Sequence, residues 1–181
     1  MKATGIVRHI DELGRIVIPK EIRKNLRIRE GDPLEIFTDS GGEIVLKKYS
    51  AMGEMTTFAK QFAEVLAQNS GHKVAISDRD NIVAIAGGFP REYLGKKVSK
   101  QLETLMRERG SINTLKKGKP IAILEGEVPV SEHQMIYPIL GDGDILGSVI
   151  ILQKDTVGIL SEVEQKLVMV AANFLGRQIE A

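Results

Sequence analysis

The residues best suited to chemistry in this sequence are six cations within its first 27 positions. Arginine and lysine neutralise phosphate groups, and arginine can also form paired hydrogen bonds to guanine. Four of the six recur at the i, i+3, i+4 and i+7 spacing that gathers side chains along one side of a helix. The set is Arg8, Arg15, Lys20, Arg23, Lys24 and Arg27. It predicts a binding face for a polyanion, and a nucleic acid suits this arrangement of cations.

These cations stand out because the chain is close to neutral overall. Its 181 residues include 25 Lys+Arg and 24 Asp+Glu, for a net charge of +1. Residues 1–29 hold eight basic and three acidic residues, whereas residues 30–46 hold five acidic residues and no basic one. A basic helical stripe is often only a solvated surface, but this segregation of charge favours a dedicated binding face.

Other chemistry finds little support in the residue types. The absence of cysteine excludes disulfides, thiolate nucleophiles and every cysteine-based metal site. The three histidines are too scattered to share a metal ion, and residues 141–144 (GDGD) predict a tight turn because the longer pattern of a calcium loop is missing. We therefore expect a protein that is not an enzyme and that holds no metal and no cofactor.

The sequence also predicts no membrane segment. No apolar run reaches the roughly 18 residues of a transmembrane helix. The first five residues (MKATG) lack the apolar stretch of a secretory signal. Tryptophan is absent and aromatic residues make up only 4%, so base stacking would contribute little to binding a nucleic acid. The expected location is the cytoplasm.

The elements that must carry the cations form a small N-terminal unit, expected over residues 1–50. Alternation of apolar residues and turn residues predict its order as strand, turn, strand, short helix and hairpin. Its apolar candidates for a core, among them Ile16, Ile36 and Ile44, are few for a stable domain. We therefore expect the unit to complete its core by pairing with a second copy. The expected elements are strands 4–10 and 15–18, helix 19–26, and hairpin strands 34–38 and 43–47.

Residues 51–53 are expected to be a linker, and residues 54–181 a C-terminal unit of the α+β class. This unit has 15 basic and 16 acidic residues, so it brings no surplus of positive charge. Ser99 is a candidate helix cap, and Ser161 and Glu164 have the spacing of a capping box. The first and last helices either complete the core or pair between subunits. The expected helices are 54–69, 99–109 and 161–180, and the expected strands are 73–77, 82–86, 120–124, 134–140 and 145–152.

Residues 3–48 resemble the AbrB-type swapped-hairpin DNA-binding domain. The resemblance is carried by the segments ATGIVR (3–8), DELGRIVIP (11–19) and IVLKKY (44–49). It implies that two protomers interleave their hairpins into one β-barrel. It also implies that Arg8, Arg15, Arg23 and Lys24 contact DNA. Lys24 departs from the arginine usual in the family, which removes a planar fork for paired hydrogen bonds, and His9 stands where a basic residue is common.

The C-terminal unit resembles a GAF domain. Residues 135–140 (MIYPIL) and 144–151 (DILGSVII) match the paired central strands of that fold. An AbrB-type unit followed by a GAF-like unit resembles a family of transcriptional regulators, activating and repressing, that control forespore genes in endospore-forming bacteria. The resemblance implies action on DNA at the nucleoid of the forespore. It also implies a dimer through the N-terminal unit and a tetramer through the GAF-like unit.

Two other functions remain open at this point. In the first, the GAF-like unit is a small-molecule sensor whose ligand, not identified by the sequence, controls DNA binding. In the second, the chain is a non-enzymatic scaffold for oligomerisation. The expected fold is α+β in all three cases, with an N-terminal swapped-hairpin barrel formed by a dimer and a GAF-like unit at residues 54–181.

Overall fold

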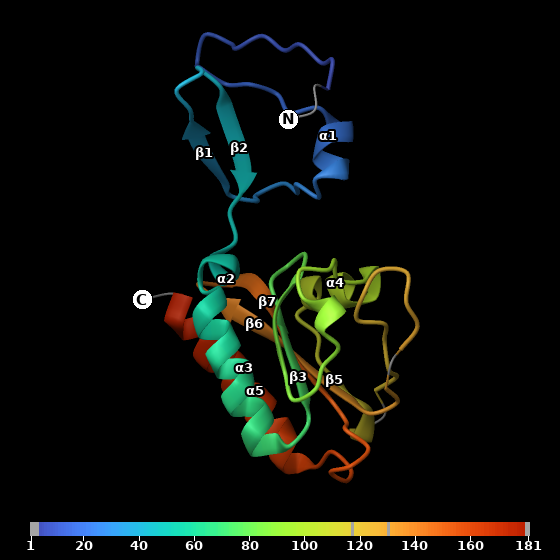
Figure 1. Ribbon diagram of the computed structural model, residues 1–181. Coiled ribbons are helices and arrows are strands. Elements are labelled where there is room, and N and C mark those ends of the chain that lie inside the picture. Colours follow the sequence, from blue (N-terminus) through green and yellow to red (C-terminus); the bar gives the residue numbers. More distant parts are fainter. Residues whose placement is uncertain (1–3, 117, 130, 180–181) are drawn as a thin grey trace. The chain divides into compact units, whose positions relative to one another are not determined.

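The computed structural model describes residues 4–116, 118–129 and 131–179. The chain divides into two units, Met1–Tyr49 and Ser50–Ala181, which are described separately below as the N-terminal and C-terminal units (Figure 1). Helices and strands are mixed in the chain, as expected for the α+β class.

The N-terminal unit contains one short helix and one hairpin. Helix α1 (Lys20–Asn25) follows Pro19, which occupies the N-cap position, and strands β1 (Leu34–Thr38) and β2 (Ile44–Lys48) pair antiparallel. Asp39 shapes the hairpin turn, because its Oδ1 accepts the backbone N–H groups of Gly41 (3.0 Å) and Glu43 (2.9 Å). The predicted helix and hairpin are therefore present.

The strands expected at residues 4–10 and 15–18 are not formed in the single chain. The turn between them is present, since Asp11 N–H donates to Arg15 O (3.0 Å) and Gly14 N–H donates to Asp11 O (2.9 Å). A strand needs a neighbour to pair with, and no ladder reaches either segment among the described residues. The sequence pattern was therefore wrong for an isolated chain, in which β1 and β2 are the only paired strands of residues 4–49.

No apolar residue among residues 4–49 is buried. Ile16 is 52% exposed, Ile36 67% and Ile44 68%, although all three were expected in a core. Isolated apolar residues on a surface need no explanation, but a unit without any buried apolar residue has no core to stabilise it. The N-terminal unit is thus incomplete as a single copy.

The C-terminal unit begins earlier than its pattern predicts. Residues 51–53 were expected to be a linker, but they belong to helix α2 (Ala51–Glu54). Ser50 caps this helix by accepting Gly53 N–H (3.0 Å), and its own hydroxyl donates to Asp78 Oδ2 (3.0 Å). Met52 is 1% exposed and belongs to the core of the unit. The segment after Tyr49 is therefore the first turn of the C-terminal unit.

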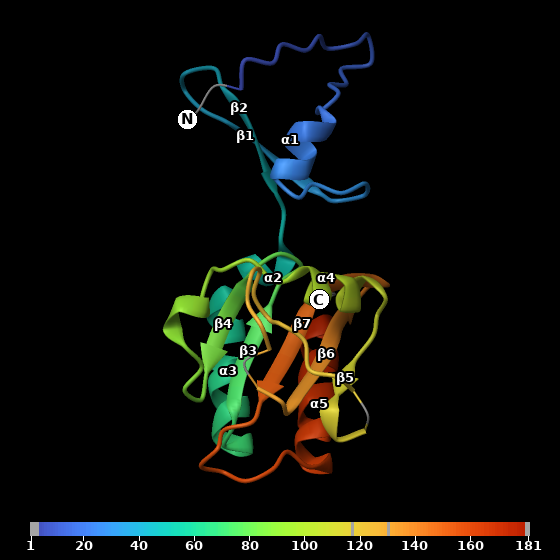
Figure 2. The ribbon, with the colours of Figure 1, turned by 90° about the vertical axis from the view of Figure 1, so that its right-hand side faces the viewer.

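A five-stranded antiparallel sheet forms the centre of the C-terminal unit. Its order is β4-β3-β7-β6-β5, which Figure 2 shows from side to side. The central hairpin β6–β7 turns at Asp142 and Gly143, both with positive φ, and such a pair suits the tight hairpin turn expected for residues 141–144. The strands are β3 (Lys73–Ser77), β4 (Ile82–Ala86), β5 (Ile112–Asn113), β6 (Gln134–Gly141) and β7 (Asp144–Leu152).

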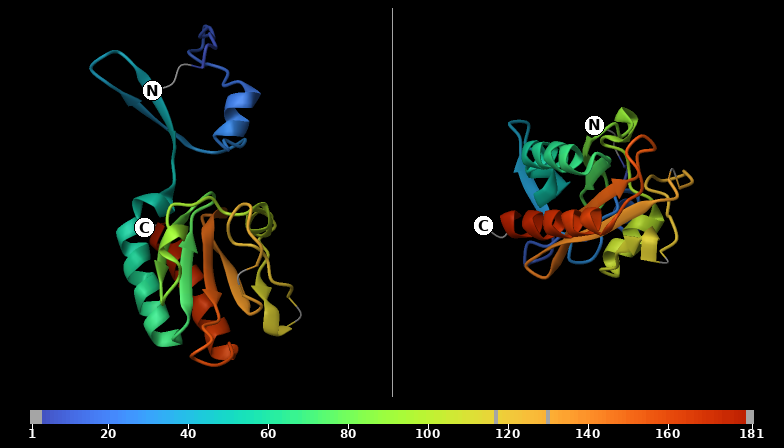
Figure 3. Two further views of the ribbon diagram at one scale, coloured as in Figure 1. Left: turned by 45° about the vertical axis from the view of Figure 1, so that its right-hand side comes forward. Right: turned by 90° about the horizontal axis from the view of Figure 1, so that it is seen from below.

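Helices cover both faces of this sheet. Helices α3 (Thr56–Ser70) and α5 (Glu162–Ile179) pack on one face, and α4 (Lys100–Arg107) packs on the other (Figures 1 and 3). Helix α5 can lie close to β6 because Gly176 has no side chain; a Cβ there would be 2.0 Å from Leu140 O. Two short 3-10 helices, η1 (Arg91–Tyr93) and η2 (Thr114–Lys116), lie before and after α4 in the chain.

Both predicted serine caps are confirmed. Ser99 Oγ accepts Leu102 N–H (3.0 Å) at the start of α4. At the start of α5, Ser161 Oγ accepts Val163 N–H (3.1 Å), as a helix cap does. Glu164 Oε2 accepts Ser161 N–H (2.7 Å), which is the glutamate half of a capping box.

The strand expected at residues 120–124 is replaced by an irregular segment. Backbone groups bond its second half, where Ile123 O accepts Ser99 N–H (2.8 Å). Side chains bond its first half: Gln134 bonds both Ile121 N–H (3.0 Å) and Ile121 O (2.9 Å). Gln101 accepts Ala122 N–H (2.9 Å), and Ser99 donates to Ala122 O (2.6 Å). These polar side chains satisfy the groups that a neighbouring strand would have paired, so the apolar pattern alone misassigned the segment.

Stability of the C-terminal unit should depend on pH through His72. His72 is 2% exposed, and its Nδ1 accepts Lys154 N–H (3.2 Å), which requires the neutral imidazole. Burial lowers the pKa of His72, although the nearby Glu164 carboxylate opposes that shift. Since the folded pKa lies below the unfolded value of about 6.5, protons favour unfolding and stability should fall as pH falls below about 6.5.

Thermal unfolding between pH 8 and pH 5 measures this effect. Replacement by asparagine, whose Oδ1 can accept the same N–H bond, should flatten the melting temperature across the His72 window. Replacement of the half-buried His133 by glutamine serves as a control and should retain the slope. Equal slopes in the wild type and His72→Asn would show that another group titrates.

Candidate nucleic-acid interface

Arg15 lies at the end of a turn that Asp11 closes. Asp11 Oδ1 accepts Leu13 N–H (3.0 Å) and Arg15 N–H (2.8 Å), and Asp11 Oδ2 accepts Arg15 Nε (2.8 Å). The backbone hydrogen bond from Arg15, followed by the bond from its side chain, lowers the pKa of the Asp11 carboxyl. The Arg15 side chain is 72% exposed, so the ion pair adds little stability. Its consequence is orientation, because it holds Nε and leaves the terminal nitrogens for a ligand.

Arg8 and Arg23 are also exposed and also bonded to backbone carbonyls. Arg8 Nη1 donates to Val7 O (3.1 Å), and Arg23 Nε donates to Ile18 O (3.2 Å). Since Ile18 follows the segment that carries Arg15, the bond from Arg23 ties α1 to that segment. The local backbone thus holds each of these arginines while its guanidinium remains accessible.

Helix α1 presents the expected cationic stripe, but only in part. Lys20, Arg23 and Lys24 are exposed on the helix at i, i+3 and i+4. The expected fourth member, Arg27, is not on the stripe because the helix ends at Asn25 and Arg27 has φ = 53°. The extension of the stripe to i+7 is therefore wrong, and Arg27 is half-buried beyond the helix.

Arg27 ends α1 in a conformation that favours glycine. Ile28 N–H donates to Arg23 O (2.8 Å) and Arg27 N–H to Lys24 O (3.2 Å), the pattern of a helix end with a left-handed residue. A left-handed backbone costs roughly 1–2 kcal/mol in a residue with a Cβ. An arginine at this position suggests that its side chain contributes something that offsets this strain.

Arg27→Gly should therefore separate stability from binding. We expect the stability of the N-terminal unit to stay unchanged or to rise by up to about 1 kcal/mol, because relief of strain outweighs the extra freedom of glycine in the unfolded chain. DNA affinity should fall because a cation is lost. Calorimetry and a binding titration measure the two effects.

A matched control exists at the end of α4. Arg109 has φ = 53°, and Gly110 N–H donates to Leu105 O (2.9 Å) in the same pattern. Arg109→Gly should not lower DNA affinity, although its effect on stability is mixed, because it relieves similar strain but also removes the bond from Arg109 Nη2 to Gly143 O. A loss of DNA affinity from Arg109→Gly as large as that from Arg27→Gly would remove the special role of Arg27.

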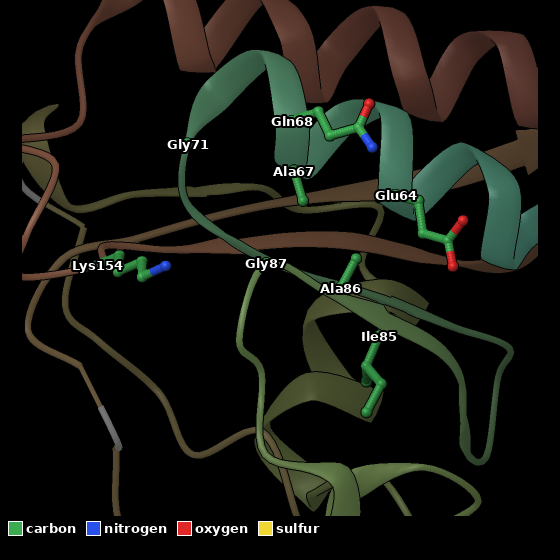
Figure 4. A pocket seen from close by; sticks show the side chains of 8 residues that line it. All are labelled: Glu64, Ala67, Gln68, Gly71, Ile85, Ala86, Gly87 and Lys154. Carbon is green, nitrogen blue, oxygen red and sulfur yellow. The ribbon is translucent and has the colours of Figure 1, made fainter.

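A hollow in the C-terminal unit lies between α3 and strand β4. Figure 4 shows Glu64 and Gln68 reaching it from α3, and Lys154 reaching it from the segment after β7. Its volume is about 520 Å³, and its lining includes the apolar residues Ala67, Ile85 and Ala86. Among the described residues, no group of three histidine or carboxylate side chains could hold a metal ion. No helix in the described part of the chain has the length and apolar character needed to cross a membrane.

Helices α3 and α5 carry a cluster of aromatic rings at the edge of the core, and α5 also carries exposed apolar residues. Phe62 and Phe174 stack across the two helices with ring centroids 5.4 Å apart, and Phe58 adjoins both at 6.1 Å. Along α5, Val163 is 61% exposed, Val170 64% and Phe174 41%, at positions i, i+7 and i+11. This exposed stripe is on the outer side of a helix whose other side is already packed on the sheet.

Comparison with known proteins identifies both units. Residues 54–180 match the family model described as "Stage V sporulation protein T C-terminal, transcription factor". Residues 7–53 match the model described as "Antidote-toxin recognition MazE, bacterial antitoxin". For the N-terminal unit, the transition state regulatory protein AbrB of Bacillus subtilis is 61% identical over 49 residues, which is 27% of this chain and 50% of AbrB.

Solved structures are similar to each of the two parts of the chain. The solution structure of the AbrB N-domain is 60% identical and covers 28% of this chain and 94% of that chain, with a TM-score of 0.26. A GAF domain from an Acinetobacter phosphoenolpyruvate-protein phosphotransferase matches with a TM-score of 0.52 at 15% identity, covering 74% of this chain and 84% of that chain. The expected GAF-like fold of the C-terminal unit is thereby confirmed.

One relative spans both units. Stage V sporulation protein T of Bacillus subtilis is 48% identical over 180 residues, which cover 99% of each chain. The chain therefore belongs to the stage V sporulation protein T family of transcription factors.

Proposed function

We propose that this chain regulates sporulation genes by binding double-stranded DNA through the cations of its N-terminal unit. The observation that carries this proposal is the set of exposed cations on the turn and on α1, in which backbone carbonyls hold Arg8 and Arg23 and the Asp11 carboxylate holds Arg15. The resemblance to AbrB supports it. As a DNA-binding regulator the chain would act at the nucleoid in the cytoplasm, and by family resemblance in the forespore. The proposed contacts are Arg8, Arg15, Lys20, Arg23, Lys24 and Arg27.

The N-terminal unit is proposed to bind DNA as a dimer with interleaved hairpins. Residues 4–10 and 15–18 have extended, unpaired segments with exposed apolar side chains, such as Val7 at 79% and Val17 at 73%. A second copy would supply both the missing strand partners and the missing core. Pairing would also double the number of cations on one assembly, which suits a two-fold symmetric DNA site.

The C-terminal unit is proposed to join two such dimers into a tetramer. The exposed stripe of Val163, Val170 and Phe174 on α5 provides an apolar surface for pairing with a second copy. No enzymatic role is part of the proposal, since the site contains cations and backbone groups suited to binding rather than to proton transfer or nucleophilic attack.

A salt-dependent gel shift tests the proposed function. The probe is a duplex selected from a random library by the full chain, and a scrambled duplex of the same composition is the control. A retarded complex that weakens with salt is expected, because phosphate neutralisation releases counterions. A scaffold without a DNA function would select no duplex above the control.

The hollow between α3 and β4 supports a second candidate function, that of a small-molecule sensor. A ligand for it would meet Lys154 at one end and Glu64 at the other, together with the apolar residues of the lining. Thermal shifts against nucleotides and amino acids test this function. A stabilising compound whose effect is lost in Lys154→Met would support the sensor.

A further inference from the structure

A buried carboxylate fastens the end of α1 to the hairpin of the N-terminal unit. The side chain of Asp32 is 0% exposed, and its Oδ2 accepts Arg29 N–H (2.8 Å) and pairs with Lys48 Nζ (3.0 Å). Lys48 Nζ also donates to Arg27 O (3.0 Å). One ammonium on strand β2 therefore reaches both the carboxylate and the residue that terminates the helix. We call Asp32, Lys48 and the Arg27 carbonyl the clamp.

The clamp lies in a unit where burial of a charge is unexpected. No apolar residue of residues 4–49 is buried, yet the Asp32 side chain is withdrawn from water. A buried ion pair is weak evidence for stability, because desolvation of the two charges offsets much of their attraction. In some proteins a buried ion pair instead selects one arrangement of the groups around it, and this geometric role is the one to test here.

The clamp contacts the C-terminal end of α1, where it can fix the orientation of the helix. A six-residue helix is not stable by itself. Its apolar residues provide little anchorage, since Leu26 is 61% exposed and Ile22 only half-buried. Ile28 N–H donates to Arg23 O (2.8 Å), which joins the helix directly to the segment that the clamp holds. The direction in which Arg23 and Lys24 point thus depends on polar contacts at the C-terminal end of the helix.

We propose that Asp32 is a positioning residue for DNA binding, which through Lys48 fixes α1 so that its cations meet the DNA backbone and bases together. This inference rests on the proposed DNA contacts of α1. Asp32 itself carries the wrong charge to touch DNA, and its buried side chain is not available for contact. Its effect must therefore pass through the position of the helix.

Asp32→Asn gives a test in which charge and position predict opposite results. The substitution removes a negative charge, so electrostatics alone predicts tighter binding to every duplex. Loss of position predicts that affinity for the selected duplex falls about tenfold, the size of one lost contact. Affinity for the scrambled duplex should stay equal or rise. Glu35→Gln, at an exposed carboxylate on β1, is the matched control and should bind both duplexes at least as tightly as the wild type.

Circular dichroism checks that Asp32→Asn is folded, and a second variant serves if it is not. If Asp32→Asn unfolds, the pair Asp32→Asn with Lys48→Met removes both partners and leaves the net charge unchanged, which is often tolerated. The same loss of selectivity is expected from the pair. A folded variant that retains the wild-type ratio of selected to scrambled affinity overturns the inference. If Arg23→Ala also leaves binding unchanged, the proposed function fails instead, so the two failures are distinguishable.

Discussion

Arg8→Ala, Arg15→Ala and Arg23→Ala will each weaken binding to the selected duplex. A loss of ~1–3 kcal/mol is expected where the arginine makes a paired contact to a base, and less where it contacts a phosphate alone. All three side chains are exposed, so the free energy of unfolding should change little. Arg23→Ala has the largest expected effect, because Arg23 links α1 to the turn segment through its bond to Ile18 O (3.2 Å).

Binding titrations and thermal unfolding of the same samples measure these effects. Lys60→Ala, on α3 of the C-terminal unit, serves as a control for loss of one exposed cation. It should bind as the wild type does. If all three arginine variants match the Lys60→Ala control, the assignment of the DNA contacts is wrong.

Removal of the C-terminal unit will weaken binding to a two-site duplex without abolishing it. The proposed contacts all lie in the N-terminal unit, so the chemistry of contact survives the truncation. Joining two DNA-binding dimers raises the effective concentration of the second, and gains of roughly 10²–10⁴ in affinity are possible when both can engage. The full chain should also show the steeper dependence on salt, because it neutralises more phosphates.

The structure sets the place of the cut. Since Met52 is part of the C-terminal core, the fragment should end at Ser50 and not at the residues once expected to be a linker. We expect fragment 1–50 to sediment as a strand-rich dimer. Equal affinity and equal salt dependence of fragment and full chain on a two-site duplex would contradict the tetramer and leave the second unit as a sensor or a spacer.

Local sequence signals predicted most of the elements in the C-terminal unit. The strands at 73–77 and 82–86 and the capped helices are where alternation, turn residues and Ser161 with Glu164 place them. The prediction of a strand at 120–124 was wrong, because Gln134 and Gln101, from elsewhere in the chain, bond backbone N–H groups of this segment. No pattern within the segment itself could have shown this.

The structure of a single N-terminal unit was harder to predict from the sequence, because much of the expected structure depends on a second copy. The strands at 4–10 and 15–18 have no partner within one chain, so their alternation describes an assembly and not a monomer. The prediction that Arg27 belongs to the cationic stripe of α1 was wrong, because helical spacing does not show where a helix ends. Within the site, Asp11 is a short turn residue four positions before Arg15, a signal that local reading could have used. Asp32 and Lys48 have no such local signal, since the fold alone brings them together.

The most direct test of the central claim is the salt dependence of binding for the wild type and for the variant with Arg8, Arg15 and Arg23 all replaced by alanine. The logarithm of affinity for the selected duplex falls linearly with the logarithm of salt concentration, with a slope of about −0.9 for each neutralised phosphate. If the three arginines each neutralise one phosphate in both copies of a dimer, the slope should become shallower by about 5. A folded, dimeric triple variant with the wild-type slope and affinity would contradict the claim that this face binds DNA.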